Sequence, residues 1–233
     1  MAETIQDVLG QNLGRELGRV VQEQPLKTRL GQIIMDSVCE FALRDERSVD
    51  ELEGGTFGRV RDPALRRTLG ETLFGARWLY KLGLVTYATN ERRAAHIRAQ
   101  IIDYAAICEA VLGDALAHGI AARHFATDAH EWGSPRTRSG KRISWSAATI
   151  EKQLRKEWPC NTFNWKIAVA AANALVDTRR ARDLDTLCRR RNKVHLAERA
   201  SIARREYIDE SADAFRTMCE VVDQVGGWQA LHP

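Results

Sequence analysis

Apolar residues recur at spacings of three and four along most of the chain, and this pattern is typical of amphipathic α-helices. The longest stretch runs from about residue 91 to residue 121. Its apolar stripe consists of Ile97, Ile101, Tyr104, Cys108, Val111, Leu112 and Ala115. A second stretch, residues 207–225, repeats at spacings of four, three, four and three through Ile208, Ala212, Phe215, Cys219 and Val222. Since such stripes pack along neighbouring helices, the sequence predicts an all-α helical bundle.

Shorter helices are expected between these two long ones. The segments are residues 147–158, which Pro159 ends, residues 163–176, and a third helix that carries Leu184, Leu187 and Cys188 on its inner face. The side chains that can cap their first turns are Ser144 or Ser146, Thr162 and Asp183, respectively. Residues 124–142 are polar and contain Gly and Pro, which indicates a loop.

The first 90 residues form a smaller helical region in this interpretation. Helices are predicted at 5–17, 28–43 and 63–82, with a charged, glycine-rich surface loop at 45–63. The third helix is expected to stop at Gly83, and residues 84–89 are either an extended linker or the strand of a winged-helix module. We therefore expect two domains: a helical region over 1–90 that can bind a partner, and a bundle of four principal helices and a short one over 91–233.

Charge is distributed unevenly along the chain, although the net charge is only +4. Residues 136–206 contain 18 Lys and Arg against 7 Asp and Glu, and the rest of the chain carries an acidic excess. Such asymmetry favours a half that faces a polyanion such as nucleic acid, and a half that faces solvent or a protein partner. A basic helical surface that only contacts water is the alternative.

The remaining composition narrows the class of protein. The five cysteines are far apart and include no C-x-x-C pair, which favours reduced, mostly buried thiols. His118, His124 and His130 are close in sequence, but no cysteine or second H-x-x-x-H histidine accompanies them, so no metal site or other cofactor is predicted. The chain has no run of eighteen apolar residues and no signal-peptide pattern at its start. We expect a cytoplasmic protein that does not contact membranes.

Candidate chemistry is concentrated in residues 188–199, CRRRNKVHLAER. Cleavage of RNA without a metal requires a base for the 2′-OH proton, an acid for the leaving 5′ oxygen and a cation for the phosphorane. Histidine can exchange a proton near neutral pH, and the guanidinium fork of arginine suits phosphate oxygens. On a helix Arg191 and His195 share a face, whereas Arg190 and His195 diverge unless the helix ends between them. The alternative is an exposed basic helix end, which complements the helix dipole.

This arrangement resembles the HEPN superfamily of helical-bundle proteins, whose mark is an Arg, four to six residues and then a His. Arg190 to His195 has the four-residue spacing, and Arg189 to His195 has five. The segments LDTLCRRRNKVHL, QIIDYAAICEAVLGDAL and YIDESADAFRTMCEVV resemble the third, first and last helices of the family, so the resemblance covers about residues 95–225. An Asn commonly follows the family arginine directly. Here Asn192 follows Arg191, so either Arg190 is the functional residue or Arg191 serves at a shortened spacing, and Arg190 is preferred.

The resemblance implies a metal-independent endoribonuclease that acts as a homodimer. His195 would be general acid or base, Arg190 or Arg191 would hold the scissile phosphate, Asn192 would position them, and Glu109 would support the site. Many family members are toxins or phage-defence effectors, so an antitoxin or other regulatory protein is a further expected partner. Other residues expected to bind RNA are the cations of the motif and of the 136–142 segment: Arg189, Lys193, Arg199, Arg136, Arg138, Lys141 and Arg142.

Two other functions fit the sequence. The first is a non-catalytic HEPN-like subunit that binds RNA or dimerises. The second is a DNA-binding regulator in which residues 146–158 and 162–175 form a helix-turn-helix, although an apolar, alanine-rich recognition helix is poorly suited to reading bases. Trp145, Trp158 and Trp165 in the basic half either stack on bases or fill the core.

Overall fold

The computed structural model describes residues 24–44, 46–85, 90–125, 130–136, 142–145, 148, 162–193 and 206–233. The chain divides into two compact units, residues 1–45 and residues 46–233. The first contains helix α2 (Gln24–Leu43), so the helix expected at 28–43 is confirmed and begins four residues earlier than the pattern indicated. The helices expected at 5–17 and, apart from Ala148, at 147–158 lie outside the described residues.

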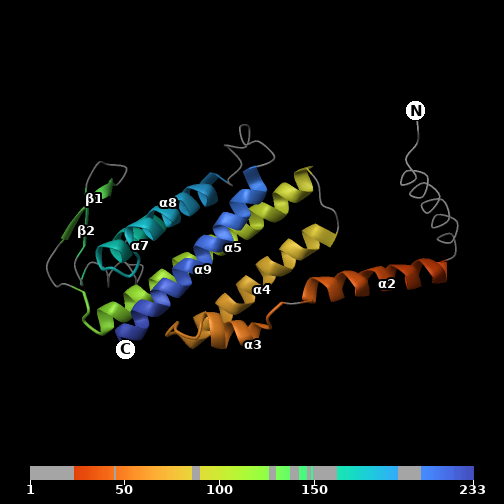
Figure 1. Cartoon of the computed structure of the whole chain (residues 1–233), viewed down its shortest axis with the longest axis horizontal. Helices are drawn as coiled ribbons and strands as arrows, with labels where there is room; N and C mark the ends of the chain where they lie inside the picture. The colour runs from red at the N-terminus through yellow and green to blue at the C-terminus, as the bar shows by residue number, and fades with distance from the viewer. Residues whose placement is uncertain are drawn as a thin grey trace. The chain divides into compact units, whose positions relative to one another are not determined.

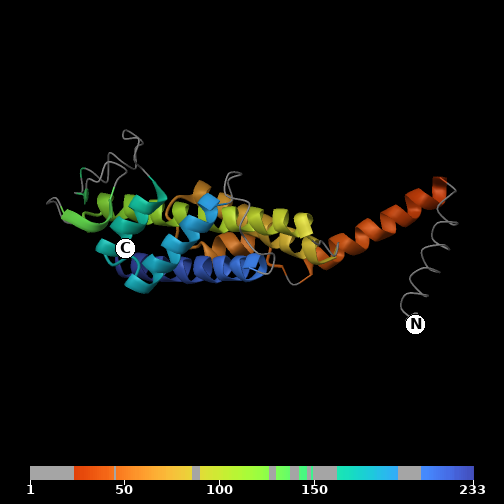
Figure 2. The ribbon, with the colours of Figure 1, turned by 90° about the horizontal axis from the view of Figure 1, so that it is seen from above.

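Four long helices build the second unit, and their arrangement confirms the all-α fold class (Figures 1 and 2). They are α4 (Pro63–Val85), α5 (Asn90–Ala121), α8 (Thr178–Lys193) and α9 (Glu206–Leu231). Helices α5 and α9 run parallel, because Ser211 Oγ donates to Gln100 Oε1 near their starts and Gln229 Nε2 donates to Asp114 Oδ2 near their ends. Figure 1 shows α4 and α8 running in the opposite direction beside this pair.

The core surrounds α5, against which α4, α7, α8 and α9 pack. Every residue of the α5 stripe expected from the sequence is buried. On α9 the expected stripe was partly wrong, because Ala212 is exposed and Phe215 and Cys219 are only half-buried. The buried face of α9 is offset by about one residue and consists of Ser211, Ala214, Met218, Val221, Val222, Val225, Trp228 and Gln229. Phe215 lies instead at the edge, where the Arg77 guanidinium of α4 stacks on its ring at 5.0 Å.

Residues 46–63 of the segment predicted as a surface loop lie mostly at the surface, but they place three apolar side chains in this core. Ser48 and Glu51 form a capping box that starts α3 (Val49–Glu51), and a π-helical turn, η1 (Leu52–Thr56), follows directly. Phe57 is fully buried and Leu52 and Val60 nearly so. The glycines and charges suggested an exposed loop, but the three apolar side chains among them supply the burial that holds it in place.

Helix α4 continues through Gly83 to Val85, so the predicted stop at Gly83 was wrong. The remainder of the expected linker or strand, residues 86–89, lies outside the described residues. Helix α4 packs along α5 within one compact unit. The predicted domain division at residue 90 therefore falls inside this unit, and the division between the units is at residue 45.

The short helix α7 (Phe163–Ala172) is capped by Thr162 as predicted but ends four residues early. Ala174 adopts a left-handed φ of 56°, and Leu175 N–H donates to Ala170 C=O, which closes the helix as a Schellman motif. The sequence offered no glycine at this turn, so the apolar pattern was extended too far.

Helix α8 begins at Thr178, six residues before the start that a cap at Asp183 predicted. Its cap is Asp177, whose Oδ1 accepts from the Arg180 backbone N–H at 2.7 Å. Asp183, the predicted cap, lies inside the helix and pairs with the Arg180 side chain.

The predicted loop at 124–142 also contains regular structure. Strands β1 (His130–Arg136) and β2 (Arg142–Trp145) pair antiparallel, with His130 opposite Trp145 and an irregularity between Trp132 and Arg136. This two-stranded hairpin is an addition to a helical fold. Strand β1 is polar and contains Gly and Pro, and the alternation of polar and apolar residues in β2 spans only four residues, so the sequence indicated a loop.

Among the described residues, Ala95–Ala121 alone is long and apolar enough to cross a membrane by length and composition, and half of its most apolar stretch is buried within the fold. Burial of this kind is also what a core helix shows. The four described cysteines are free: Cys108 and Cys188 are buried, Cys219 is half-buried and Cys39 is exposed.

Candidate functional site

Glu109 joins three helices at the carboxyl-terminal part of α8. It lies in the middle of α5, and its Oε2 accepts from Arg191 Nη1 of α8 at 2.7 Å. Its Oε1 accepts from Lys166 Nζ of α7 at 3.4 Å. The side chains of Glu109 and Lys166 are 21% and 13% exposed, so this ion cluster is largely removed from solvent. The supporting glutamate expected from the sequence therefore contacts the motif, through Arg191.

The cluster contains two cations and one carboxylate, and it therefore carries a net positive charge. Arginine has five N–H donors, and within the described structure Arg191 uses one of them, on Glu109. Its side chain remains 34% exposed. A guanidinium that is fixed on one edge and open on the other can donate to two phosphate oxygens in the bidentate geometry that arginine favours.

Arg190, the arginine preferred from the motif spacing, faces away from this cluster. Its Nη2 donates to Asp213 Oδ2 at 3.3 Å and its Nη1 to the Glu210 carbonyl oxygen at 3.4 Å, both on α9. The Glu210 carboxylate lies 3.8 Å from its Nε. Arg190 is thus surrounded by acidic groups that compensate its charge and hold α8 against α9.

The neighbouring motif residues have separate surroundings. Arg189 is exposed and forms an ion pair with Asp185 one turn earlier on α8. Asn192 is exposed, and its Nδ2 lies 3.9 Å from Cys188 Sγ, at the limit for a weak hydrogen bond. Burial raises the pKa of the Cys188 thiol, and nearby Arg191 opposes that rise, so this cysteine is a neutral packing residue.

The remaining predicted site residues are only partly described. His195 and Arg199 lie outside the described residues, as do Arg138 and Lys141. Lys193 is the last residue of α8, and Arg136 and Arg142 are paired positions in the hairpin, with only their backbone described. In the structure Arg191 therefore contacts Glu109, whereas Arg190 contacts the acidic residues of α9.

Lys166 was missed in the sequence. It is the one charged residue in the apolar segment 163–176, and an isolated charge in such a segment signals a buried partner. Gly113 of α5 faces Lys166, and a Cβ added at this glycine would lie 3.7 Å from Nζ. The lysine head therefore lies close against α5.

Burial of α7 argues against the helix-turn-helix alternative. Its side chains at Phe163, Trp165 and Ile167 are each at most 4% exposed, so the helix cannot present them to a DNA groove. Trp165 fills the core, as one of its two predicted roles required, while the side chains of Trp145 and Trp158 lie outside the described set.

His118 and His124, two of the three histidines noted in the sequence, lie beside His232, which follows the end of α9. His118 Nε2 lies 2.7 Å from the His232 carbonyl oxygen, and the His232 ring stacks on Trp228 at 4.3 Å. The His124 ring meets the His232 ring edge-on at 4.9 Å. Burial and the two other histidines lower the pKa of His124. Within the described ranges, no group of three or more His, Cys, Asp or Glu side chains is arranged to hold a metal ion.

No protein-family model matches the chain, and the searches of curated proteins and of solved structures also find no match. The functional assignment therefore depends on the chemistry of the Arg191, Glu109 and Lys166 cluster and on the motif that contains it.

Proposed function

We propose that the protein is a metal-independent endoribonuclease of the HEPN type, in which Arg191 and His195 act on the scissile phosphate and Glu109 positions Arg191. The observation that carries the proposal is the 2.7 Å contact of Arg191 with Glu109, four residues before His195. The family resemblance of residues 95–225 supports the same assignment. A toxin or phage-defence role in the cytoplasm, restrained by a protein partner, fits this activity.

Arg191 is favoured over Arg190 for an electrostatic reason. A phosphate that approached Arg190 would also approach the carboxylates of Asp213 and Glu210, which would repel it. A phosphate at Arg191 would meet a cluster whose net charge is positive, with Lys166 as a second cation. The spacing to His195 is then one residue shorter than the family's usual minimum.

The chemistry needs few groups. One histidine takes the 2′-OH proton as O2′ attacks phosphorus, and Arg191 stabilises the charge that develops on the non-bridging oxygens. The bond from phosphorus to O5′ then breaks, and a second acid gives O5′ its proton. In a homodimer the His195 of a second copy supplies that acid, and the products are a 2′,3′-cyclic phosphate and a 5′-OH.

The test is cleavage of total RNA in EDTA by purified protein and by single variants. Wild type is expected to cleave, and His195→Ala and Arg191→Ala to lose at least about 100-fold in rate, the scale of a missing acid-base or charge-stabilising group. Arg190→Ala should retain most of the activity, because Arg190 serves packing against α9. Arg216→Ala, an exposed α9 arginine paired with Asp213, is the matched control for loss of one positive charge.

Loss of activity in Arg190→Ala together with full activity in Arg191→Ala would overturn the assignment of the arginine. Circular dichroism spectra of each variant establish that a loss is not unfolding. End analysis of the fragments tests the reaction, since a 3′-OH product would exclude attack by the 2′-OH.

A non-catalytic RNA-binding or dimerising subunit is the second candidate. It is favoured by the pairing of Arg190, the arginine at the family spacing, with carboxylates of α9. RNA retention without cleavage by wild type would support it.

A further inference from the structure

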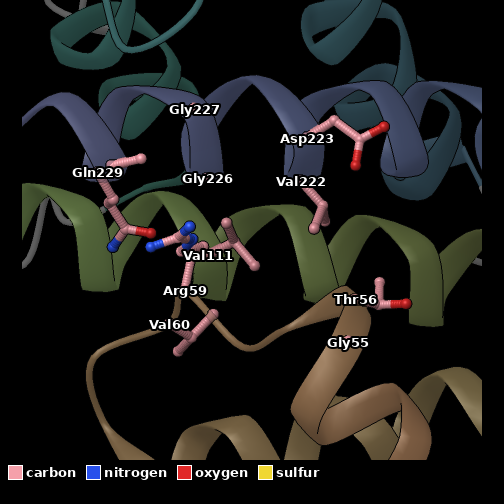
Figure 3. Close-up of a pocket in the computed structure, with 11 residues that line it drawn as sticks. Gly55, Thr56, Arg59, Val60, Val111, Val222, Asp223, Gly226, Gly227 and Gln229 are labelled. Carbon is pink, nitrogen blue, oxygen red and sulfur yellow. The ribbon is translucent and has the colours of Figure 1, made fainter.

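A pocket of about 250 Å³ opens between the turn after η1, the middle of α5 and the last turns of α9, away from the Glu109 cluster (Figure 3). Its apolar lining includes Val60, Val111 and Val222, one from each of these elements, and each is at most 5% exposed. Pockets that take drug-sized ligands have volumes of about 300–1,000 Å³. This one is therefore sized for a smaller molecule.

Glycines keep the pocket open. Gly55, Gly226 and Gly227 line it. A Cβ added at Gly55 or Gly227 would meet nothing within 4 Å, and one at Gly226 would be 3.6 Å from Arg59 Cγ, an ordinary contact. Packing therefore does not require glycine at these positions, and glycine inside a helix is unfavourable relative to alanine. What alanine would take away is space in the pocket.

Two opposite charges stand at the ends of the pocket. In Figure 3 Arg59 lies beside Gln229 on one side, Asp223 and Thr56 lie on the other, and Val111 and Val222 come between them. Both side chains are exposed, and within the part of the chain that the structure describes neither the Arg59 guanidinium nor the Asp223 carboxylate makes a hydrogen bond or ion pair. Gln229, at 2% exposure, is fixed by its bond from Nε2 to Asp114 Oδ2.

We propose that this pocket binds a small zwitterion, with an anionic group at Arg59, an ammonium group at Asp223 and a short apolar chain across the valines. A simple anion would satisfy Arg59 but face the Asp223 carboxylate, and a simple cation would face the Arg59 guanidinium. A molecule with both charges separated by methylene groups pairs both residues and covers the apolar lining.

The probe is 5-aminopentanoate, with pentanoate and 1-aminopentane as controls that each lack one charge. Binding to the full-length protein is followed by ¹H–¹⁵N NMR, through the backbone amides of Gly55, Gly226 and Gly227. Saturable shifts at these amides are expected for the zwitterion with a dissociation constant on the order of 1 mM or below. The two controls should bind at least about tenfold more weakly, since each loses one charge-assisted contact. Equal binding of all three compounds, or no saturable shift with the zwitterion, overturns the proposal.

Charge variants test the two ends separately. Arg59→Met and Asp223→Asn should each weaken binding of the zwitterion about tenfold or more. The matched controls are Arg61→Met and Asp209→Asn, which should leave the affinity for the zwitterion unchanged. Arg61 lies two residues further along the same turn, and Asp209 is exposed at the other end of α9. Unaltered affinity in Arg59→Met or Asp223→Asn contradicts the assigned contacts.

The double variant Gly226→Ala/Gly227→Ala separates a ligand site from a structural role. Alanine favours the helix, so the thermal midpoint of unfolding should rise, while the narrowed pocket should lose affinity for 5-aminopentanoate. A higher midpoint with unchanged affinity would show that the glycines do not shape the site and would overturn the proposal. Stability and binding are measured on the same variant, so a double variant that misfolds is recognised by a lower thermal midpoint. In that case the single variant Gly227→Ala is measured in the same two ways.

Discussion

At the scale of single residues, Glu109 is bound to cations from two different helices. Its oxygens are divided between Lys166 and Arg191, and the three side chains are mostly covered by the fold. Hydrogen bonds to charged groups contribute more than neutral ones, and a covered cation that loses its partner keeps its desolvation cost. The same residue that would position Arg191 for chemistry is thus also a residue that holds α5, α7 and α8 together.

Glu109→Gln is expected to lower the free energy of unfolding by about 1–3 kcal/mol, because the amide keeps the shape and loses the charge that two cations face. Urea unfolding at neutral pH measures the change. Glu71→Gln is the matched control, since Glu71 pairs with Arg67 on an exposed face of α4 and its removal should have a much smaller effect. Equal losses in both variants would show that the junction is no stronger than a surface ion pair.

Ala174 is the other residue whose effect can be isolated. Its left-handed backbone costs an L-residue about 1–2 kcal/mol, and glycine would remove that strain at an entropic cost of about 0.5–1 kcal/mol in the unfolded chain. Ala174→Gly should therefore stabilise the protein by about 0.5–1 kcal/mol in urea unfolding. Ala172→Gly, two residues earlier and still helical, should do the opposite. Destabilisation by both substitutions would argue against the Schellman turn.

Residues of the site could be predicted where the sequence pattern was local. Glu109 stood out within the long amphipathic helix, and three arginines preceded Asn192. Which arginine meets Glu109 could not be predicted, because Arg190 and Arg191 differ by one position and about 100° on the helix. Their assignment depends on where α5 and α9 lie around α8, which is a tertiary property. Lys166, by contrast, could have been predicted to have a buried acidic partner, because it is the one charged residue in an apolar segment.

At the scale of elements, cap chemistry decides where α8 begins. Asp177 Oδ1 accepts from Arg180 N–H, and Asp177 Oδ2 accepts from Gln224 Nε2 of α9. The same carboxylate therefore starts one helix and attaches it to another. Asp183 also precedes an apolar pattern, but its position inside the helix could be recognised only after Asp177 was known to supply the cap.

The backbone N–H of Arg180, foremost among several hydrogen bonds, lowers the pKa of Asp177. A carboxyl group whose pKa is lower in the folded than in the unfolded state stabilises the fold. This stabilisation is fully present at pH values above the unfolded-state pKa, about 3.9, and is lost as the pH falls through the folded-state pKa. Asp177→Ala should thus lower the urea midpoint at pH 7, and the difference from wild type should shrink progressively below about pH 4. Asp183→Ala should show a smaller loss at pH 7. A larger loss in Asp183→Ala would return the cap to the position expected from the sequence.

The long apolar repeats predicted the existence of α5 and α9 and the buried face of α5, whereas the buried face of α9 was offset and elements built around one or two residues were not predicted. The stripe of α5 needed only its spacing. By contrast, Phe57 and Val60 are held in the core by a capping box and a π-helical turn, which leave no periodic pattern. The hairpin strands likewise depend on cross-strand pairing between two short segments, which the helical pattern does not predict.

At the scale of the whole molecule, the division at residue 45 places α2 in a different compact unit from the core cluster, whose members all lie in residues 46–233. Glu46, 7% exposed in its side chain, pairs with Arg77 and Lys81 of α4 and fixes the start of the second unit. Deleting residues 1–43 removes α2 and leaves this ion cluster intact. The shortened chain should keep the urea midpoint of the full chain within experimental error, as followed by circular dichroism. A clearly lower midpoint would show that α2 contributes to the stability of the second unit.

The parallel pairing of α5 and α9 also governs how quickly the protein can assemble. Contacts between these helices, such as Gln100 with Ser211, join positions 111 residues apart in the chain, whereas α4 and α5 are consecutive and antiparallel. Closing the long loop between α5 and α9 costs chain entropy before the contacts between these helices can form. Hairpins of helices that are neighbours in sequence therefore form early, and the packing of helices that are distant in sequence forms late. The α4–α5 hairpin should then be the scaffold on which α9 docks last. One wall of the glycine-lined pocket and the carboxylates around Arg190 belong to α9. Both features would therefore form only in the final step of folding. A partly folded or nascent chain would then have neither a complete pocket for a ligand nor the carboxylates that hold the Arg190 side chain against α9.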